Sequence, residues 1–310
     1  MKIAFVFPGQ GSQSVGMLDS FAGNPAVEDV LREASAALGQ DLAALIKDGP
    51  AESLSLTVNT QPVMLAAGYA VYRAWRAAGG AEPAVVAGHS LGEYTALVVA
   101  GALAFRDAVP LVRYRAQVMQ EAVPAGVGAM AAILGLDAEG VAAACAKAAQ
   151  GQVVEPVNFN TPEQIVIAGH REAVERAIAV ATEAGAKRGV LLPVSAPFHS
   201  TLMRPAGERL AAKLASVAVT APRLPVVHNA DVAEHPEPDA IRAALARQAA
   251  SPVRWVETIR AFAARGVTEV VECGPGRVLT GMCKRIDRNL KGYALDAGAD
   301  IDTVRAALAG

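Results

Sequence analysis

Pro83-Ala84-Val85-Val86-Ala87-Gly88-His89-Ser90-Leu91-Gly92 decides the fold of this chain. The stretch starts as an apolar run of strand length, ends in a G-x-S-x-G pattern, and is followed by a helical pattern through residue 100. Strand, sharp turn and helix in this order form a nucleophile elbow, where glycines relieve the crowding around a strained serine. The following helix directs free N–H groups toward the place where an oxyanion would form. We therefore predict that Ser90 is a nucleophile.

The composition fits an α/β protein. The chain has 310 residues, enough for one large domain with an insertion or for two modest domains. Hydrophobic residues make up 53% and aromatic residues only 5%, so the core is aliphatic, as in helices packed on a buried parallel sheet. The 28 basic and 30 acidic residues give a net charge of −2, and no long run of either sign occurs. We therefore expect no nucleic-acid partner.

The sequence also predicts a protein of the cytoplasm. The longest apolar stretches fall short of the ~20 residues that span a bilayer, so no membrane partner is expected. The N-terminal apolar run reaches Pro8 and Gly9 too early for a signal peptide. The three cysteines, Cys145, Cys273 and Cys283, lack C-x-x-C spacing and imply no disulfide framework, which is typical of a reducing compartment. Metal-ligand spacing is lacking as well, so no metal is expected.

Predicted strands and helices alternate along the chain, and its middle has a pattern of its own. The first strand, residues 3–7, is closed by the turn Gly9-Gln10-Gly11, and a buried helix opens at Thr60-Gln61-Pro62 and runs through Tyr72. The middle elements are strand 128–136, helix 137–150, strands 152–158 and 164–169, helix 171–184 and strand 189–194. This β-α-β-β-α-β order is the split βαβ pattern of a ferredoxin-like unit.

The alternation on both sides of this unit indicates a three-layer α/β core with a mostly parallel sheet. We assign residues 1–125 and 197–310 to this core and residues 126–196 to an inserted ferredoxin-like subdomain. Residues 297–310 are expected to form a short, weakly anchored tail.

A serine hydroxyl becomes a good nucleophile only when a base takes its proton, and His199 is the best candidate for that base. It lies in a turn between a predicted strand and a predicted helix, and it follows the nucleophile in chain order, as in α/β hydrolases. His89 adjoins Ser90 and more often shapes such a site than serves as its base. For His228 and His235 we expect structural or solvent roles.

No acid stands at a clear loop position between Ser90 and His199, because Asp107 and Asp137 both look like helix N-caps. A dyad, with the histidine oriented by an amide or carbonyl oxygen, fits better than a complete triad. The carboxyl ends of parallel strands share one edge, so the turn at Gln10 can meet the elbow there. An oxyanion hole built from the N–H of Leu91 and one N–H of this turn is then expected.

Seven motifs follow one another in order from the first strand to about Lys284. They are Phe7-Pro8-Gly9-Gln10-Gly11-Ser12-Gln13, Gly88-His89-Ser90-Leu91-Gly92-Glu93-Tyr94, Arg115 with Met119-Gln120-Glu121, Asn158-Phe159-Asn160 leading to Val166-Ile167-Ala168-Gly169, Ala196-Pro197-Phe198-His199-Ser200, Gln248 ahead of Pro252-Val253-Arg254-Trp255, and Glu272-Cys273-Gly274-Pro275-Gly276. Together they resemble the malonyl-CoA:acyl carrier protein transacylase family. That resemblance implies a hydrolase-like α/β core with a ferredoxin-like insert.

The resemblance also implies the catalytic roles. Ser90 is the nucleophile that becomes acylated, and His199 is the base. The N–H groups of Leu91 and Gln10 form the oxyanion hole. The segment at Gln248 supplies the oxygen that orients the histidine, which answers the missing acid.

For the substrate, the resemblance implies that Arg115 holds the free carboxylate of a malonyl group. A guanidinium forms the planar, two-pronged hydrogen bond to a carboxylate that a lysine cannot copy. Asn158 and Asn160, near the junction with the insert, are expected to contact substrate, and His89 to shape the site. One departure from the family pattern is His228, which stands where an N-N-x-D pattern is expected.

The resemblance implies ping-pong transfer from malonyl-CoA, with release of coenzyme A, to the phosphopantetheine thiol of acyl carrier protein, without a metal or redox cofactor. Carrier proteins are acidic, so basic residues around the mouth of the cleft are expected to dock them. Our candidates for that surface are Lys187, Arg188, Lys284 and Arg285. With no long heptad pattern, a monomer is expected.

Three alternatives stay open at the level of sequence. A hydrolase would use the same nucleophile and base with water as acceptor, although Arg115 and the missing triad acid count against it. A free-standing acyltransferase of polyketide synthesis, or a malonate decarboxylase subunit, would keep the chemistry and change the pathway. An inactive homologue could serve as a carrier-binding module, but Ser90, His199, Arg115 and Gln10 together oppose that.

Overall fold

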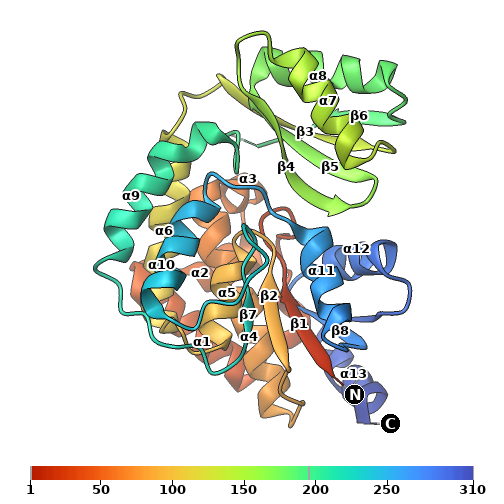
Figure 1. The fold of residues 1–310 in the computed structure, drawn as a ribbon. Coiled ribbons are helices and arrows are strands. Elements are labelled where there is room, and N and C mark those ends of the chain that lie inside the picture. The colour runs from red at the N-terminus through yellow and green to blue at the C-terminus, as the bar shows by residue number, and fades with distance from the viewer. Residues whose placement is uncertain (1, 195, 310) are drawn as a thin grey trace.

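The computed structural model describes residues 2–194 and 196–309, which form two sheets and the helices around them (Figure 1). The larger sheet has the strand order β7 (Val226–Val227), β2 (Val85–Gly88), β1 (Ile3–Phe7), β8 (Glu269–Cys273) and β9 (Lys291–Leu295). All neighbouring strands in this order are parallel. The strands predicted next to the elbow and at the start of the chain are therefore confirmed.

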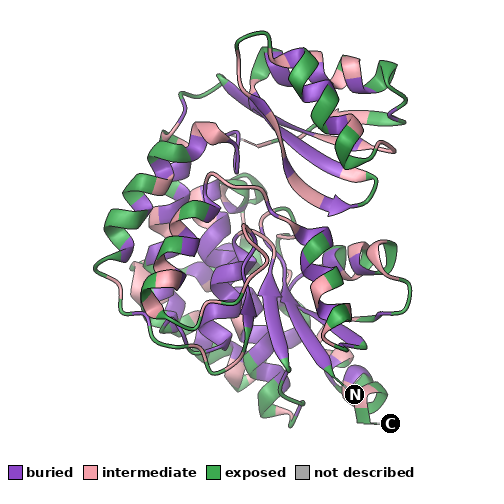
Figure 2. Cartoon of the chain, in the orientation of Figure 1, coloured by how far each residue is buried: buried purple, intermediate pink, exposed green. Residues whose placement is uncertain are grey.

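Alternate residues of each strand point to opposite sides of this sheet. Because both sets are apolar, helices cover both faces. Phe5 and Phe7 of β1 pack in one apolar cluster, and Ala4 and Val6 pack in another. The helices of the first cluster are α1 (Pro25–Leu38), α2 (Leu42–Asp48), α3 (Ala51–Ser55), α4 (Thr57–Ala77), α5 (Gly92–Val99), α6 (Phe105–Glu121), α9 (Arg204–Leu214), α10 (Pro238–Gln248) and α13 (Gly298–Ala309). The second cluster contains α11 (Trp255–Ala264) and α12 (Val278–Ile286). Strands β1, β2, β7 and β8 are buried between these layers, as Figure 2 shows for β1 and β2, whereas the edge strand β9 is partly exposed.

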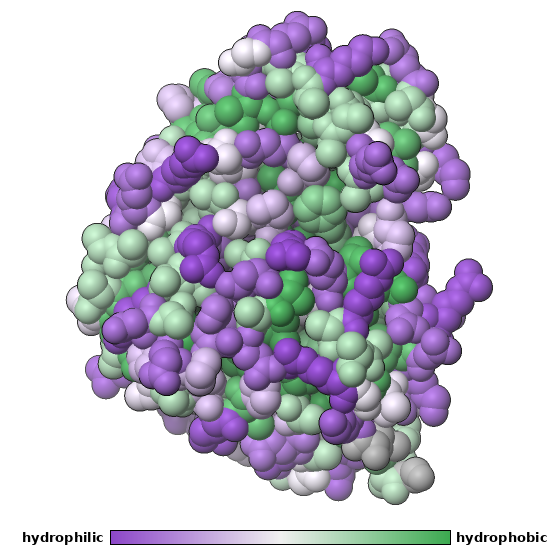
Figure 3. Space-filling model, viewed as in Figure 1, coloured by the Kyte–Doolittle hydropathy of each residue, from purple (hydrophilic) through white to green (hydrophobic). Residues whose placement is uncertain are grey.

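The middle of the chain forms a second, antiparallel sheet with a core of its own. Its elements are β3 (Gly128–Leu134), α7 (Ala138–Ala149), β4 (Val154–Thr161), β5 (Gln164–His170), α8 (Arg171–Glu183) and β6 (Arg188–Leu191). The strands lie in the order β4-β5-β3-β6. A separate apolar cluster joins Ile133 of β3 to Val141 of α7 and Val174 of α8. This part lies at the top of Figure 1, and in that view hydrophilic and hydrophobic residues are interspersed over the surface (Figure 3).

Some local predictions are wrong. The expected C-terminal tail is helix α13, because Ile301 and Val304 are buried against the main core. Helix α4 begins at Thr57, so Pro62 lies within it rather than at its first positions. Asp107 lies inside α6, whose N-cap is Ala104.

One predicted N-cap is confirmed, and several elements appear that the sequence did not predict. The N-cap prediction is confirmed for Asp137, whose Oδ1 accepts a hydrogen bond from Gly140 N at 2.8 Å. Helices α2, α3 and α12 and strand β9 were not expected. Residues 195 and 310 lie outside the described residues. Among the described residues, no helix is long and apolar enough to cross a membrane.

Candidate active site

Ser90 occupies a left-handed turn between β2 and α5. Its φ is 52°, a region that residues with a side chain rarely adopt. The flanking glycines leave room for it: a Cβ on Gly92 would overlap Phe7 O, and a Cβ on Gly88 would overlap the backbone of Gly92. Leu91 is the N-cap of α5, so the helix starts immediately after the serine. The G-x-S-x-G pattern thus allows the elbow to pack against the end of β1.

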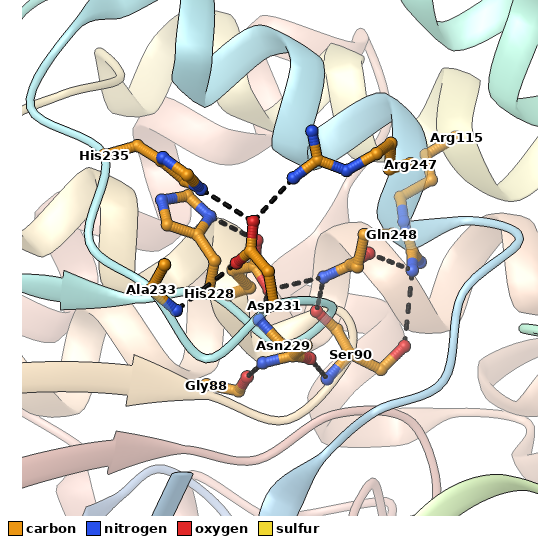
Figure 4. A network of polar contacts seen from close by, with 11 residues as sticks. Gly88, Ser90, Arg115, His228, Asn229, Asp231, Ala233, His235, Arg247 and Gln248 are labelled. Carbon is orange, nitrogen blue, oxygen red and sulfur yellow. Dashed lines mark hydrogen bonds and ion pairs between the residues drawn. The ribbon is translucent and has the colours of Figure 1, made fainter. Parts of the chain in front are cut away.

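Asn229 holds this strained turn from the loop after β7 (Figure 4). Its Oδ1 accepts a hydrogen bond from Ser90 N at 2.7 Å, and its Nδ2 donates to Gly88 O at 2.7 Å. The residue is fully buried. An unusual backbone conformation persists only where its surroundings fix it. Sequence reasoning did not give Asn229 a role, although it noticed the departure at the preceding residue.

His199 contacts the serine directly. Its Nε2 lies 2.7 Å from Ser90 Oγ, and its Nδ1 lies 2.9 Å from the main-chain oxygen of Gln248. A carbonyl oxygen can only accept, so Nδ1 carries the proton and Nε2 is free to accept the serine hydrogen. Burial lowers the pKa of His199 to about 3, and the nearby positive charge of Arg115 contributes in the same direction. The imidazole is therefore neutral at pH 7, as a base must be.

Arg115 is a buried cation whose hydrogen-bond partners are neutral. It belongs to α6 and is 2% exposed. Its Nη1 donates to Gln61 Oε1 at 2.8 Å, and its Nη2 donates to Gln248 Oε1 at 2.9 Å and to Ser90 Oγ at 3.3 Å. Burial lowers the pKa of Arg115 below its ordinary value. A desolvated guanidinium held by amide and hydroxyl oxygens is suited to an anionic ligand.

These side chains surround a small cavity of about 120 Å³ between the two sheets. Its polar lining comes from Gln10, Gln61, His89, Ser90, Arg115, Asn158 and His199. Its apolar lining comes from Leu91, Met119, Met130, Leu192, Val194 and Phe198. The volume suits an acyl group of a few heavy atoms and not a long chain.

The turn after β1 packs against the elbow. A Cβ on Gly9 would lie 2.5 Å from His89 O and 3.7 Å from Leu91 N. The main-chain N–H groups of Gln10 and Leu91 donate to no acceptor within the described part of the chain. Two free donors at the edge of a cavity can hold an oxyanion.

The predicted substrate contacts are arranged differently from one another. Asn158 of β4 lines the cavity, and its buried Oδ1 has no partner among the described residues. Asn160 is not part of the cavity lining; instead its Oδ1 lies 2.8 Å from His89 Nε2. The ring of His89 also packs against Trp255, and burial lowers its pKa. The pair His89 and Asn160 therefore joins the elbow to the second sheet.

A buried carboxylate that sequence reasoning missed lies behind the site. Glu93, in the first turn of α5, is fully buried. It accepts hydrogen bonds from His228 Nδ1 at 2.7 Å, Asn229 N at 2.8 Å and Gln248 Nε2 at 3.0 Å. In the sequence Glu93 looks like an ordinary first-turn acid, which favours a helix N-terminus wherever it occurs. His228 is buried too, which excludes a solvent role for it.

A second cavity, of about 860 Å³, is basic. Lys187, Lys284, Arg285 and Arg288 line it, together with residues of the β4–β5 hairpin. Three of the four basic residues predicted for docking thus gather in one place, whereas Arg188 is not part of this lining. No group of three potential metal-ligating side chains occurs among the residues that the structure describes.

The chain is similar to known acyl transferases over nearly its whole length. The acyl transferase domain model matches residues 4–296. The malonyl CoA-acyl carrier protein transacylase of Escherichia coli (strain K12) is 57% identical over 296 residues, which cover 95% of this chain and 96% of that relative.

Solved structures agree with this similarity. An acyl-carrier-protein S-malonyltransferase from Burkholderia pseudomallei 1710b has a TM-score of 0.98 at 62% identity, with 99% of this chain and 100% of that chain covered. A structure of a type II PKS acyl-carrier protein in complex with its malonyl-transacylase matches with a TM-score of 0.98 at 50% identity. The match covers 99% of this chain and 100% of that chain.

Proposed function

The chain belongs to the acyl transferase family, among the malonyl-CoA:acyl carrier protein transacylases, and from this premise we propose that Ser90, His199 and Arg115 carry its reaction. The enzyme transfers the malonyl group from malonyl-CoA to the phosphopantetheine thiol of acyl carrier protein, for fatty acid synthesis. One observation carries the assignment of roles. Ser90 Oγ lies 2.7 Å from the neutral His199 and 3.3 Å from the buried Arg115, inside a cavity of acyl size.

In the first half-reaction, His199 Nε2 accepts the hydroxyl proton while Ser90 Oγ attacks the thioester carbonyl of malonyl-CoA. The N–H groups of Leu91 and Gln10 hold the tetrahedral oxyanion, and each donor contributes on the order of 3 kcal/mol of transition-state stabilisation. The carbon–sulfur bond then breaks, and coenzyme A leaves with the proton from His199. The product is a malonyl ester on Ser90.

In the second half-reaction, the carrier thiol takes the place of coenzyme A. His199 accepts the thiol proton as the sulfur attacks the malonyl ester, and the same two N–H groups hold the second oxyanion. Collapse breaks the ester bond and returns the proton to Ser90 Oγ. The nucleophile and base are thus regenerated without any other group being consumed, so no metal or redox cofactor is part of the proposal.

Arg115 selects the acyl group. Its partners are amide and hydroxyl oxygens, so the malonyl carboxylate supplies the charge that the buried guanidinium lacks. An acetyl group would leave that charge unmatched. Asn158, whose Oδ1 has no partner among the described residues, lies at the cavity wall and contacts the bound acyl thioester.

The roles are tested by the intact mass of the protein after brief exposure to malonyl-CoA or acetyl-CoA, with Ser90→Ala as control. The expected result is a malonyl adduct that requires Ser90, is discharged by holo acyl carrier protein, and far exceeds any acetyl adduct. Equal labelling by acetyl-CoA would contradict the role of Arg115. An adduct that disappears in buffer alone would instead support a hydrolase.

We also propose that the fold consists of a hydrolase-like core and a ferredoxin-like subdomain. The antiparallel order β4-β5-β3-β6, with two helices on one face, supports a ferredoxin-like subdomain of residues 126–196. Residues 1–125 and 197–310 then form a hydrolase-like core, which is supported by the elbow after β2 and the parallel sheet. We further propose a monomer that works in the cytoplasm, where its three buried free cysteines stay reduced.

The carrier protein docks at the basic cavity lined by Lys187, Lys284, Arg285 and Arg288. An acidic partner gains association rate from such a surface, and the gain falls with salt. Lys284→Glu is therefore expected to raise the KM for carrier severalfold at low salt, whereas Lys213→Glu, on the exposed face of α9, is expected to leave it unchanged. An unaltered KM in Lys284→Glu would exclude this surface.

A polyketide carrier is the second candidate acceptor, because a relative of the same fold forms a complex with one. Comparing the second half-reaction with a fatty acid carrier and a polyketide carrier decides between them. The carrier with the higher kcat/KM is the acceptor.

A further inference from the structure

Glu93 is a buried carboxylate for which the proposed reaction has no use. It is fully buried, and its two oxygens accept three hydrogen bonds, two from the loop after β7 (His228 and Asn229) and one from Gln248 at the end of α10. None of its hydrogen-bond partners in the described part of the chain is an arginine or a lysine. Burying a carboxylate away from arginine and lysine is unfavourable unless its hydrogen bonds are well made. Its position therefore calls for a reason within the site.

Gln248 connects this carboxylate to the site. Its Nε2 donates to Glu93 Oε2 at 3.0 Å. Nε2 also donates to Ser90 O at 2.8 Å, and the amide Oε1 accepts from Arg115 Nη2 at 2.9 Å (Figure 4). A carboxylate and a carbonyl can only accept, so both must face the amide nitrogen. The opposite orientation of the amide would place oxygen against two acceptors and an NH₂ group against a guanidinium. The amide oxygen is thus directed at Arg115.

We infer that Glu93 is a positioning residue that makes the site selective for an anionic acyl group, by fixing the Gln248 amide against Arg115. The inference rests on the proposed role of Arg115. The negative charge of Glu93 also raises the pKa of Arg115 without a direct contact, because the amide of Gln248 lies between them. A carboxylate in direct contact would occupy the donors that an anionic substrate needs. Glu93 therefore supports the cation and leaves it available.

Glu93 has a second connection, and the two connections predict different effects. Glu93 accepts a hydrogen bond from Asn229 N, and the side chain of Asn229 accepts one from Ser90 N. Glu93 is thereby also connected to the turn that holds Ser90. A disturbance of that turn lowers the reactivity of Ser90 toward every thioester alike. A disturbance of the amide of Gln248 weakens the binding of malonyl groups alone. The ratio of malonyl to acetyl transfer separates the two effects.

The experiment measures the rate of Ser90 acylation by malonyl-CoA and by acetyl-CoA in single turnover. Glu93→Gln replaces the pure acceptor by an amide of the same shape, which lets the Gln248 amide turn over. Gln248→Met removes the connecting amide and keeps the main-chain oxygen that His199 contacts. Both variants are expected to lower the malonyl-to-acetyl ratio at least about tenfold, because a hydrogen bond to a charged group is involved. The double variant is expected to lower it no further than Gln248→Met alone.

Glu269→Gln is the matched control. Glu269 is also a buried glutamate, but it lies in β8 beside Ile3 at the start of β1. That is the opposite end of the sheet from Ser90. Its substitution is expected to leave the ratio unchanged. Arg115→Ala is measured first, because an unchanged ratio there refutes the proposed selection itself.

If Arg115→Ala lowers the ratio and Glu93→Gln does not, the inference about Glu93 is wrong. It is equally wrong if Glu93→Gln slows both thioesters by the same factor, because Glu93 then acts through Asn229. Thermal unfolding of each variant shows whether it is folded. If Glu93→Gln does not fold, Gln248→Met decides: a lowered ratio supports the amide connection, and an unchanged ratio overturns it.

Discussion

His199 donates its Nδ1 hydrogen to the main-chain oxygen of Gln248, at 2.9 Å, and not to a carboxylate. An aspartate in this place would stabilise the imidazolium form, whereas a carbonyl offers only a dipole. The hydrogen bond to the carbonyl orients the base and raises its pKa, but by less than burial lowers it. Burial then lowers its pKa to about 3.

The acid limb of the reaction is expected to follow this low pKa. In the proposed mechanism His199 acts as neutral imidazole, so acylation of Ser90 by malonyl-CoA is expected to slow only when the pH falls toward the pKa of about 3. The single-turnover rate is thus expected to stay level between pH 8 and about pH 5. A rapid-quench pH profile measures it, and an acid limb centred near the ordinary histidine pKa of about 6.5 would contradict it.

The same pKa predicts how stability depends on pH. His199 stays neutral in the folded protein, whereas in the unfolded chain it binds a proton below about pH 6.5, so lowering the pH favours unfolding. Between pH 7 and pH 5 this residue alone is expected to remove about 2 kcal/mol of the free energy of unfolding. Urea unfolding of the wild type and of His199→Gln at both pH values measures it. The variant is expected to lose about that much less, and an equal loss in both proteins would refute the prediction.

Asn229→Ala removes the side chain that holds the elbow. It removes the partner of the part-buried Ser90 N–H and of the buried Gly88 O, which is expected to lower the free energy of unfolding by about 1–3 kcal/mol. It is also expected to slow acylation by malonyl-CoA and acetyl-CoA to the same extent, because Ser90 itself is displaced. Denaturant unfolding and single-turnover rates check both effects. Asn289→Ala, at an exposed position, is the control and is expected to change neither.

Two glycines in helices are expected to respond in opposite directions to alanine. A Cβ on Gly92 would overlap Phe7 O, so Gly92→Ala is expected to destabilise the protein by more than about 4 kcal/mol or to prevent folding. A Cβ on Gly281 of α12 would meet nothing within 4 Å. Gly281→Ala is therefore expected to stabilise the protein by about 0.5–1 kcal/mol. Thermal unfolding of both variants measures the contrast, and equal changes would show that the elbow tolerates a side chain.

The elbow and the turn after β1 could be predicted from sequence because their signals are local. The glycines around Ser90 and after Phe7 are needed because the neighbouring backbone leaves no room for a Cβ. The partners of the site could not be predicted in the same way. Asn229 contacts Ser90 across 139 residues, and Glu93 contacts Gln248 across 155 residues. Which polar side chain reaches which other one depends on packing that no local pattern records.

The C-terminal elements were missed for a related reason. Strand β9 pairs in parallel with β8, 22 residues earlier in the chain, so no tight hairpin turn announces it. Its burial is also weak, with Lys291 and Gly292 exposed. Helix α13 buries only Ile301 and Val304. Such short apolar signals are no stronger than those of a surface loop, and tertiary contacts decide the outcome.

Because the hydrogen-bond partners of Arg115 are neutral, its electrostatic environment differs between the vacant enzyme and the malonyl-loaded enzyme. In the vacant enzyme the guanidinium donates to neutral oxygens and has only the more distant charge of Glu93, whereas in the proposed acyl-enzyme the malonyl carboxylate forms a direct ion pair with it. Binding of the malonyl group thus neutralises the buried charge of Arg115, and its transfer to the carrier leaves that charge without a direct ion pair again. The proposed acyl-enzyme is then the more stable state of the catalytic cycle, and it holds an activated malonyl group until a carrier protein binds.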